Sequence, residues 1–143
     1  MNSLLFPDVN VWVALHHQLH SHHEVALRWF EALRPERTMA FCRQTQVGFF
    51  RSLTTEAVMG DEALTQSQCW TLYRQWIANG KAELLSEPSG VSQAFEQRTM
   101  TDSTSPKAWM DDYLAAFAEA GKLTLVTFDR ALAAKAKGAV LLG

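Results

Sequence analysis

Short apolar segments alternate with longer segments of helical periodicity along the whole of this 143-residue chain. Apolar runs separated by helices are typical of parallel strands that are buried on both faces of a sheet. The predicted strands are residues 3–7, Thr38–Cys42, Glu83–Leu85, Leu123–Thr127 and Ala139–Leu142. No internal repeat, low-complexity tract or linker interrupts the alternation. The pattern therefore predicts one α/β domain over residues 1–143, with a mainly parallel sheet of four to five strands between helices.

Capping signals and helix breakers mark the helices between these strands. Ser21 with Glu24, and Thr65 with Gln68, have the spacing of capping boxes, and Ser105–Pro106 places proline at a first helical position. The predicted helices are Asn10–Leu19, a helix that opens at Ser21 and has its apolar face from Val25 to Leu33, Arg43–Leu53, a helix from Thr65 to Ala78, a helix from Glu87–Pro88 to Thr99, a helix from Pro106 to Gly121, and one from about Arg130.

Three aspartates lie where strands end or a helix begins. Asp8 follows the first strand, Asp129 follows the strand Leu123–Thr127, and Asp111 lies near the start of a helix. Right-handed crossovers bring the carboxyl ends of parallel strands to one edge, where open α/β sheets bind their ligands. Carboxylates gathered there would repel one another unless a cation neutralised them, and Mg²⁺ and Mn²⁺ prefer oxygen ligands. The three aspartates therefore predict a divalent metal site.

Each aspartate also has a structural explanation. Asp8 and Asp129 precede helices and could be N-caps, and Asp111 could be a first-turn acid that complements the helix dipole. On the helix of Asp111, the same face carries the apolar residues Leu114, Ala115 and Ala118, which suit packing on the sheet. Asp112 is rotated by roughly 100° from that face. We therefore expect Asp111 in the site and Asp112 in solvent.

The composition narrows the possible classes of function. A formal net charge of −2 argues against a protein that holds nucleic acid through bulk charge alone, although a local basic rim beside an acidic site would suffice. Cys42 and Cys69 have no paired spacing, so we expect two thiols in a reducing cytoplasm instead of a disulfide framework or zinc knuckle. No signal peptide or membrane span is indicated. A cytoplasmic globular protein is expected.

The histidine cluster offers an alternative metal site. His16 and His20 have the spacing of a zinc pair, but His17 replaces the glutamate of an H-E-x-x-H motif and no third ligand is evident. We interpret the cluster as solvated or hydrogen-bonded surface groups. No glycine-rich phosphate loop is present either, so the sequence gives no support for a nucleotide cofactor.

Three stretches resemble a known family, the VapC-type toxins among the PIN-domain ribonucleases. They are PDVNVWVAL, TQVGFFRSLT and DDYLAAFAEAGKLTLVTFDRAL, and they span nearly the whole chain in the family's order. The last is the most specific, because an aspartate that opens an alanine-rich helix is followed by glycine, an apolar strand and T-x-D. The resemblance implies a three-layer α/β/α sandwich that cleaves RNA.

The resemblance also implies site residues and partners. Asp8, Asp111 and Asp129 would bind Mg²⁺ or Mn²⁺, with Asn10 and Thr127 as polar supporting residues. The expected partners are an RNA substrate and a small antitoxin whose tail fills the acidic groove. A homodimer or higher oligomer is expected, and DNA binding would belong to the antitoxin.

The chain departs from the family pattern at one position. Many members have a glutamate three residues before an arginine such as Arg51, whereas this chain has Gly48 there, with Gln46 nearby as a possible amide ligand. Three carboxylates would bind one metal adequately and a second only weakly. Arg43, Arg51 and Arg130 are the candidate contacts for substrate phosphate, and each could equally be a surface ion-pair residue.

Two other functions remain open from the sequence. An aspartyl phosphatase on a similar sheet would have a D-x-D start at Asp8, but Asn10 occupies the place of its second acid. A binding module could keep the fold and, without the fourth acid, cleave little or no RNA. A phosphorylated Asp8 would favour the first, and absence of Mn²⁺ binding and of cleavage would favour the second.

Overall fold

A five-stranded parallel sheet forms the centre of the molecule. The computed structural model describes residues 4–143, and its strands are β1 (Leu5–Pro7), β2 (Met39–Phe41), β3 (Ala82–Leu84), β4 (Thr124–Thr127) and β5 (Val140–Leu141). Their order is β3-β2-β1-β4-β5, and every neighbouring pair is parallel. The predicted α/β class and parallel sheet are confirmed, while residue 3 of the first predicted strand lies outside the described residues.

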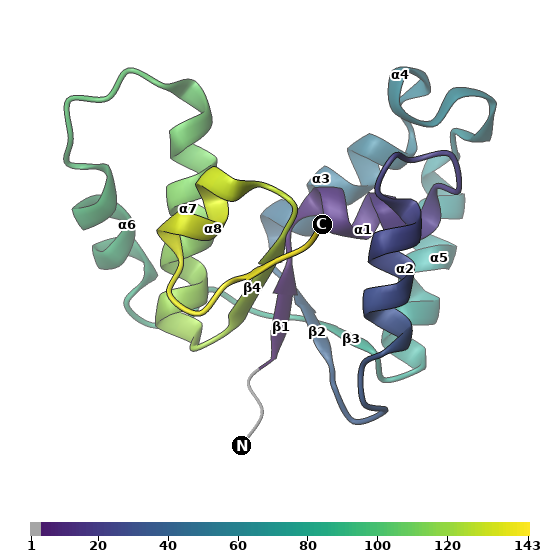
Figure 1. Cartoon of the computed structure of the whole chain (residues 1–143), viewed down its shortest axis with the longest axis horizontal. Helices are drawn as coiled ribbons and strands as arrows, with labels where there is room; N and C mark the ends of the chain where they lie inside the picture. The colour runs from purple at the N-terminus through teal and green to yellow at the C-terminus, as the bar shows by residue number, and fades with distance from the viewer. Residues whose placement is uncertain (1–3) are drawn as a thin grey trace.

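Helices cover both faces of the sheet, as Figure 1 shows. One face carries α1 (Val9–His16), α2 (His23–Glu31), α3 (Arg43–Leu53) and α5 (Gln66–Ala78). The other face carries α6 (Val91–Thr99), α7 (Pro106–Gly121) and α8 (Arg130–Lys135). The segment between α3 and α5, for which no element was predicted, contains α4 (Glu56–Met59) and a 3₁₀ turn, η1 (Gly60–Glu62). The fold is the three-layer α/β/α sandwich that the resemblance implies.

The central strands β1 and β2 are apolar throughout because both of their faces are buried, whereas Glu83 and Leu84 of β3 are exposed. Leu5 of β1 and Met39 of β2 pack in the core beneath α1, α3 and α5. Phe6 and Ala40, the next residues along each strand, pack in the second core beneath α7 and α8. Successive strand side chains point to opposite faces, so a strand between two helical layers has no exposed face on which polar residues would be favoured.

Two of the predicted helix starts are present. Thr65 Oγ1 accepts a hydrogen bond from Gln68 N at 3.2 Å. In return, Gln68 Oε1 accepts one from Thr65 N at 2.9 Å, which completes the reciprocal capping box. Ser105 is the N-cap of α7, and Pro106 is the first helical residue. Proline fits there because its missing N–H would have no intrahelical partner.

The predicted capping box of Ser21 and Glu24 is wrong. α2 begins at His23, and its N-cap His22 makes no side-chain capping hydrogen bond. The His22 ring instead stacks on Phe128, with ring centroids 4.1 Å apart. The turn is closed by other local hydrogen bonds, such as that from His23 N to His20 O at 3.0 Å, and the His22 ring adds a long-range aromatic contact that the sequence spacing did not suggest.

The helices are all short. α1 ends at His16, before the predicted end at Leu19. α7 is the longest helix described, with 16 residues. No helix in the described part of the chain combines the length and apolar character needed to cross a membrane.

The strand order reverses between β1 and β4. From β1 the sheet continues to β2 and β3, and from β4 it continues in the opposite direction to β5. Pro7 at the end of β1 pairs with Val126 of β4, so the residues that follow both strands leave the sheet side by side. Open α/β sheets bind ligands at such a reversal, outside the carboxyl ends of the strands.

Candidate active site

Asp8 lies at this reversal and contacts two elements. Its backbone N donates to Val126 O at 3.0 Å, which continues the pairing of β1 with β4. Its Oδ1 accepts a hydrogen bond from Val11 N at 3.3 Å and caps α1, while its Oδ2 accepts one from the Thr127 hydroxyl at 2.5 Å. The structural explanation of Asp8 as an N-cap is confirmed. The cap uses one oxygen and leaves the other facing β4.

Asp129 repeats this arrangement at the end of the neighbouring strand. Its Oδ1 accepts hydrogen bonds from Ala131 N at 2.8 Å and Leu132 N at 3.1 Å, so it caps α8. Its Oδ2 faces Lys107 Nζ at 2.7 Å. Asp129 N donates to Thr127 Oγ1 at 2.9 Å. The fully buried Thr127 hydroxyl therefore links the carboxylate of Asp8 to the backbone of Asp129.

Asp111 joins the group from the opposite helical layer. α7 begins at Pro106, so Asp111 lies in its second turn and is not the first-turn dipole acid considered as an alternative. Its Oδ2 is 2.5 Å from Lys107 Nζ. Because this nitrogen also contacts Asp129 Oδ2, the two carboxylate oxygens can be no farther apart than the sum of the two contact distances. All three predicted acids thus lie at the carboxyl edge of the sheet.

The acids of the site differ in their electrostatic surroundings. Burial raises the pKa of Asp8 above its ordinary value of 3.8, the hydrogen bond from Thr127 opposes this, and the charge of Asp129 adds to the rise. The hydrogen bond from Lys107 lowers the pKa of Asp129. Hydrogen bonds to Asp111 and Asp129 raise the pKa of Lys107 in turn. The site thus combines a cluster of acidic side chains with one lysine that contacts two of them.

The donor atoms suit a hard divalent cation, although they are not arranged around one. Within residues 4–143, no group of three histidine, cysteine, aspartate or glutamate side chains has the geometry of a ready-made metal site. Asp111 and Asp129 face Lys107 instead, and Asp8 faces Thr127. The ammonium group of Lys107 bridges the carboxylates of Asp111 and Asp129. Carboxylate oxygens are also the ligands that Mg²⁺ and Mn²⁺ prefer. The residues therefore fit such an ion if it takes the place of the ammonium.

The position of the family glutamate is closed by a neighbouring side chain. A Cβ atom added at Gly48 would lie 2.7 Å from Val9 Cγ2, so a larger residue there requires Val9 to move. Gln46 does not replace the acid, because its amide oxygen accepts a hydrogen bond from the Arg43 guanidinium at 2.5 Å. In this chain, the absence of a side chain at position 48 therefore allows α1 and α3 to pack closely at Val9.

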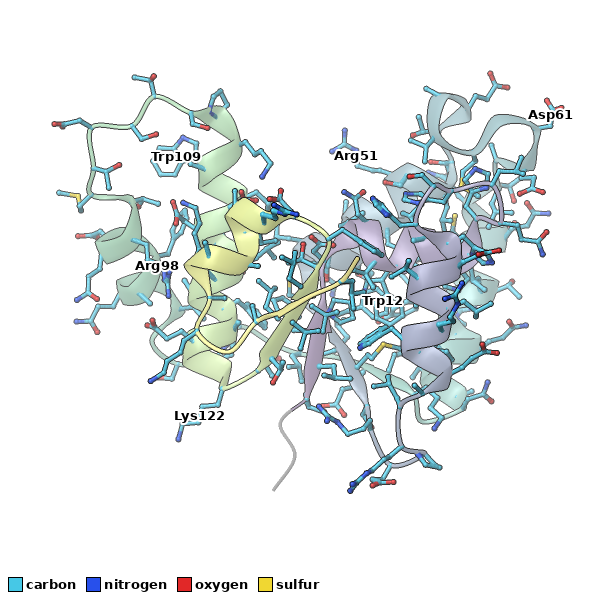
Figure 2. All side chains as sticks on the ribbon, in the orientation of Figure 1. Trp12, Arg51, Asp61, Arg98, Trp109 and Lys122 are labelled. Carbon is cyan, nitrogen blue, oxygen red and sulfur yellow. The ribbon has the colours of Figure 1, made fainter. Side chains whose placement is uncertain are left out.

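The remaining predicted residues lie at or near the same edge. Asn10 is exposed in the first turn of α1, and Arg130 is exposed at the start of α8. Arg51 is exposed on α3 and projects beyond the carboxyl ends of the strands (Figure 2). Arg43 is exposed at the start of α3, where it contacts Gln46. These placements leave Arg51 and Arg130 free of the acids while keeping them close to the same side of the sheet.

The expectation that Asp112 points to solvent is wrong. Asp112 is buried, with 7% of its surface exposed, and its Oδ1 accepts a hydrogen bond from Lys135 Nζ at 2.9 Å. α8 packs against α7 and covers the side of α7 that carries Asp112. The helical periodicity of α7 alone gives no sign of this second contact. Asp112 therefore forms a structural ion pair between two helices. No pattern in the sequence identifies Lys135 as its partner.

The histidine cluster does not provide a zinc pair. His16 Nε2 accepts a hydrogen bond from Trp76 Nε1 at 2.8 Å. This bond fixes the proton of the neutral ring on Nδ1, which donates it to Trp12 O at 2.8 Å. Burial lowers the pKa of His16, which agrees with a neutral ring. Both nitrogens are engaged, so His16 has no lone pair to offer a metal together with His20.

The chain is similar to PIN-domain proteins both in its sequence and in its fold. The model of the PIN domain family matches residues 5–138, a range that contains all the elements that carry the acids. Ribonuclease VapC41 of Mycobacterium tuberculosis (strain CDC 1551 / Oshkosh) is 35% identical over 132 residues, which cover 90% of each chain.

Solved structures share the fold at low sequence identity. VapC20 of Mycobacterium tuberculosis, described as a sarcin–ricin loop cleaving toxin, aligns with a TM-score of 0.64 and 16% identity over 91% of this chain and 93% of its own. VapBC2 of Rickettsia felis, solved with a DNA fragment from the promoter of its genes, aligns with a TM-score of 0.61 and 14% identity over 96% of both chains. At these identities the alignments bear on the fold alone.

Proposed function

This chain belongs to the PIN domain family, among its VapC-type ribonucleases, and we propose that it is a divalent-metal-dependent endoribonuclease that acts as the toxin of a toxin–antitoxin pair. One observation carries the proposal beyond family membership. Asp8 and Asp129, which are far apart in sequence, follow adjacent strands at the reversal of the sheet, and Asp111 reaches the same place through Lys107. Acid groups in this position are suited to metal-assisted phosphodiester hydrolysis.

Asp8, Asp111 and Asp129 would hold the metal. A bound Mg²⁺ or Mn²⁺ ion supplies Lewis-acid activation of water and stabilises charge on the phosphate oxygens. The Thr127 hydroxyl fixes Asp8 relative to the strand end that carries Asp129, because it donates to one and accepts from the other. Asn10, exposed on the first turn of α1, is placed to orient a carboxylate or water.

The basic residues have a separate role in this mechanism. Arg130 directly follows Asp129, and Arg51 projects beyond the carboxyl ends of the strands (Figure 2); both are exposed and would bind substrate phosphates through their planar, multiply donating guanidinium groups. Arg43 is a weaker candidate because it contacts Gln46. A few local arginines would suffice to position RNA on a chain whose net charge is slightly negative.

Incubation of the purified protein with total RNA tests the proposal. Cleavage should occur with Mg²⁺ or Mn²⁺, stop when EDTA is added, and return when excess Mn²⁺ is restored, because the metal activates the attacking water. RNA fragments are separated on a denaturing gel. Cleavage that continues unchanged in EDTA would contradict metal dependence. Absence of cleavage at high protein concentration in both metals would contradict the nuclease assignment.

Adjacent aspartates on α7 provide a matched pair of variants. Asp111→Asn is expected to reduce RNA cleavage about a hundredfold or more, because a metal ligand loses its charge. Asp112→Asn should leave cleavage within a few-fold of wild type. It should lower the free energy of unfolding by about 1 kcal/mol, since the half-buried Lys135 loses a charged partner. Cleavage rates and urea unfolding of both variants check this, and the reverse order of activity loss would refute the assignment of Asp111.

The toxin role requires a partner. We propose a small antitoxin as that partner, whose tail covers the acidic edge, and a homodimer or higher oligomer of this chain, with DNA binding supplied by the antitoxin. The structural neighbour from Rickettsia felis is itself a VapBC2 complex bound to DNA, which supports such an arrangement. A short reading frame overlapping the upstream end of the gene would identify the antitoxin, and co-purification of its product would test the pairing.

One observation favours a second function. Gly48 has no side chain to bind metal where many family members have a glutamate. Val9 fills the space beside Gly48, so no other side chain occupies that place as a fourth ligand. A PIN-fold binding module that cleaves little RNA would result if three carboxylates fail to bind metal. Calorimetry with Mn²⁺ separates the two functions, since the binding module should show no heat of metal binding.

A further inference from the structure

Lys107 occupies an unusual place for a lysine. Its Nζ lies 2.5 Å from Asp111 Oδ2 and 2.7 Å from Asp129 Oδ2, and so joins α7 to the end of β4. Its side chain is 61% exposed, so packing does not hold it there. It lies in the first turn of α7, where a positive charge is disfavoured by the helix dipole. The two carboxylates are therefore what holds this ammonium group in position.

The oxygens that hold Lys107 are the ones proposed to bind metal. Mg²⁺ binds oxygen at about 2.0–2.1 Å and requires a complete coordination shell around itself. An ammonium group within hydrogen-bonding distance of both oxygens fills that space, and its charge repels a divalent ion. The ammonium group and the metal ion therefore exclude each other from Asp111 and Asp129.

We propose that Lys107 is a built-in competing cation, which bridges Asp111 and Asp129 in the metal-free protein, must be displaced when the divalent ion binds, and so sets the metal affinity of the site. This inference rests on the proposed function, because it requires a metal site at these acids. Its physical basis is charge balance. Without metal, one ammonium offsets part of the repulsion between the clustered carboxylates. With metal, the divalent ion takes over that role, and the flexible lysine side chain moves to solvent.

Other lysines of the chain provide matched controls. The chain has five lysines, of which Lys135 forms a similar pair with Asp112 but does not contact the proposed ligands. Lys137 is exposed in the turn that follows α8. Lys137→Met removes the same charge as Lys107→Met from the surface, so it measures the effect of net charge alone.

Calorimetric titration with Mn²⁺ measures the competition directly. Lys107→Met should bind Mn²⁺ about five- to tenfold more tightly than wild type, because the two ion pairs of the exposed Lys107 side chain no longer have to be broken. Lys137→Met should differ from wild type by less than about twofold, since charge at a distance is screened by salt. Equal affinity of Lys107→Met and wild type overturns the proposal while leaving the metal site intact. Absence of binding in both proteins overturns the metal site itself.

A second measurement uses the wild-type protein and needs a variant only to assign one signal. In ¹⁵N-lysine-labelled metal-free protein, the ammonium signals of Lys107 and Lys135 should both be protected from exchange with water, because both groups are held by carboxylates, and Lys107→Met should identify the first signal by its loss. Addition of diamagnetic Mg²⁺ should abolish the protection of Lys107 as its ammonium is released, while the signal of Lys135 persists. A Lys107 signal that remains protected at saturating Mg²⁺ shows that the ion does not displace the lysine, and refutes the inference.

Discussion

Replacement of Asp8 or Asp129 by asparagine is expected to abolish RNA cleavage, with a loss of about a thousandfold or more, while the fold is retained. Each substitution removes a negative charge proposed to hold the metal, and metal activation contributes a large part of the rate in such reactions. Asparagine preserves both helix caps because its side-chain oxygen can accept the backbone hydrogen bonds that Oδ1 now accepts. Folding and activity should therefore separate cleanly in these variants.

The two substitutions should change stability in opposite directions. The pKa of Asp8 is raised in the folded protein, mainly by burial, so its ionised form disfavours folding. This penalty is fully present above the raised pKa and is relieved as the pH falls toward the ordinary value of 3.8. Asp8→Asn should thus stabilise the metal-free protein at neutral pH, by about 2–4 °C in melting temperature for each kcal/mol relieved. The gain should shrink on acidification.

Asp129 has the opposite linkage. Lys107 lowers its pKa, so its charge contributes stability that is present above the ordinary value of 3.8 and is lost as the pH falls through the lowered pKa. Asp129→Asn should therefore lower the melting temperature at neutral pH, and its difference from wild type should disappear in acid. Melting curves from acidic to neutral pH in EDTA, alongside cleavage assays in Mn²⁺, check both variants. Asp61→Asn, an exposed acid on η1 (Figure 2), is the matched control. Full cleavage by Asp8→Asn or Asp129→Asn would falsify the site.

Trp12→Ala is expected to lower the free energy of unfolding by about 3–5 kcal/mol, the usual cost of deleting a buried aromatic side chain. Trp12 is fully buried between the sheet and its helices (Figure 2). Its ring stacks on Phe41 with centroids 4.1 Å apart and meets the edge of Trp76 at 5.2 Å. Because α1 starts from the Asp8 cap, the same ring also holds the helix that positions this acid.

The indole nitrogen of Trp12 predicts a graded response. This Nε1 is buried and finds no hydrogen-bond partner among the described residues. Trp12→Phe removes this unsatisfied donor and keeps most of the ring, so its cost should stay below about 1.5 kcal/mol. Trp109→Ala makes the same deletion at a side chain that is 59% exposed and should cost far less than Trp12→Ala. Urea unfolding monitored by circular dichroism ranks the three, and a small effect of Trp12→Ala would contradict the importance of this packing.

Much of the architecture follows from short-range patterns. The runs that became β1 and β2 are buried on both faces, and so are Leu125 and Val126 in the centre of β4, which is why these positions are apolar. The capping box of Thr65 and the proline at the start of α7 form as predicted because their hydrogen bonds and backbone angles are local. Ser21 shows the limit of such reasoning, since the contact of His22 with Phe128 comes from a distant part of the chain.

The candidate site also has one part that follows from local sequence patterns and one part that depends on long-range packing. That Asp8 and Asp129 follow strands of a parallel sheet and reach one edge could be predicted from the sequence, because chirality and parallel pairing leave few other arrangements. The charged groups that meet at this edge could be identified only from the packing of the folded chain. Lys107 bridges α7 and the β4 end, Lys135 pairs with Asp112, and Val9 fills the space beside Gly48. These contacts depend on how whole helices pack across the sheet, and no local periodicity or spacing specifies which side chains then lie within hydrogen-bonding distance.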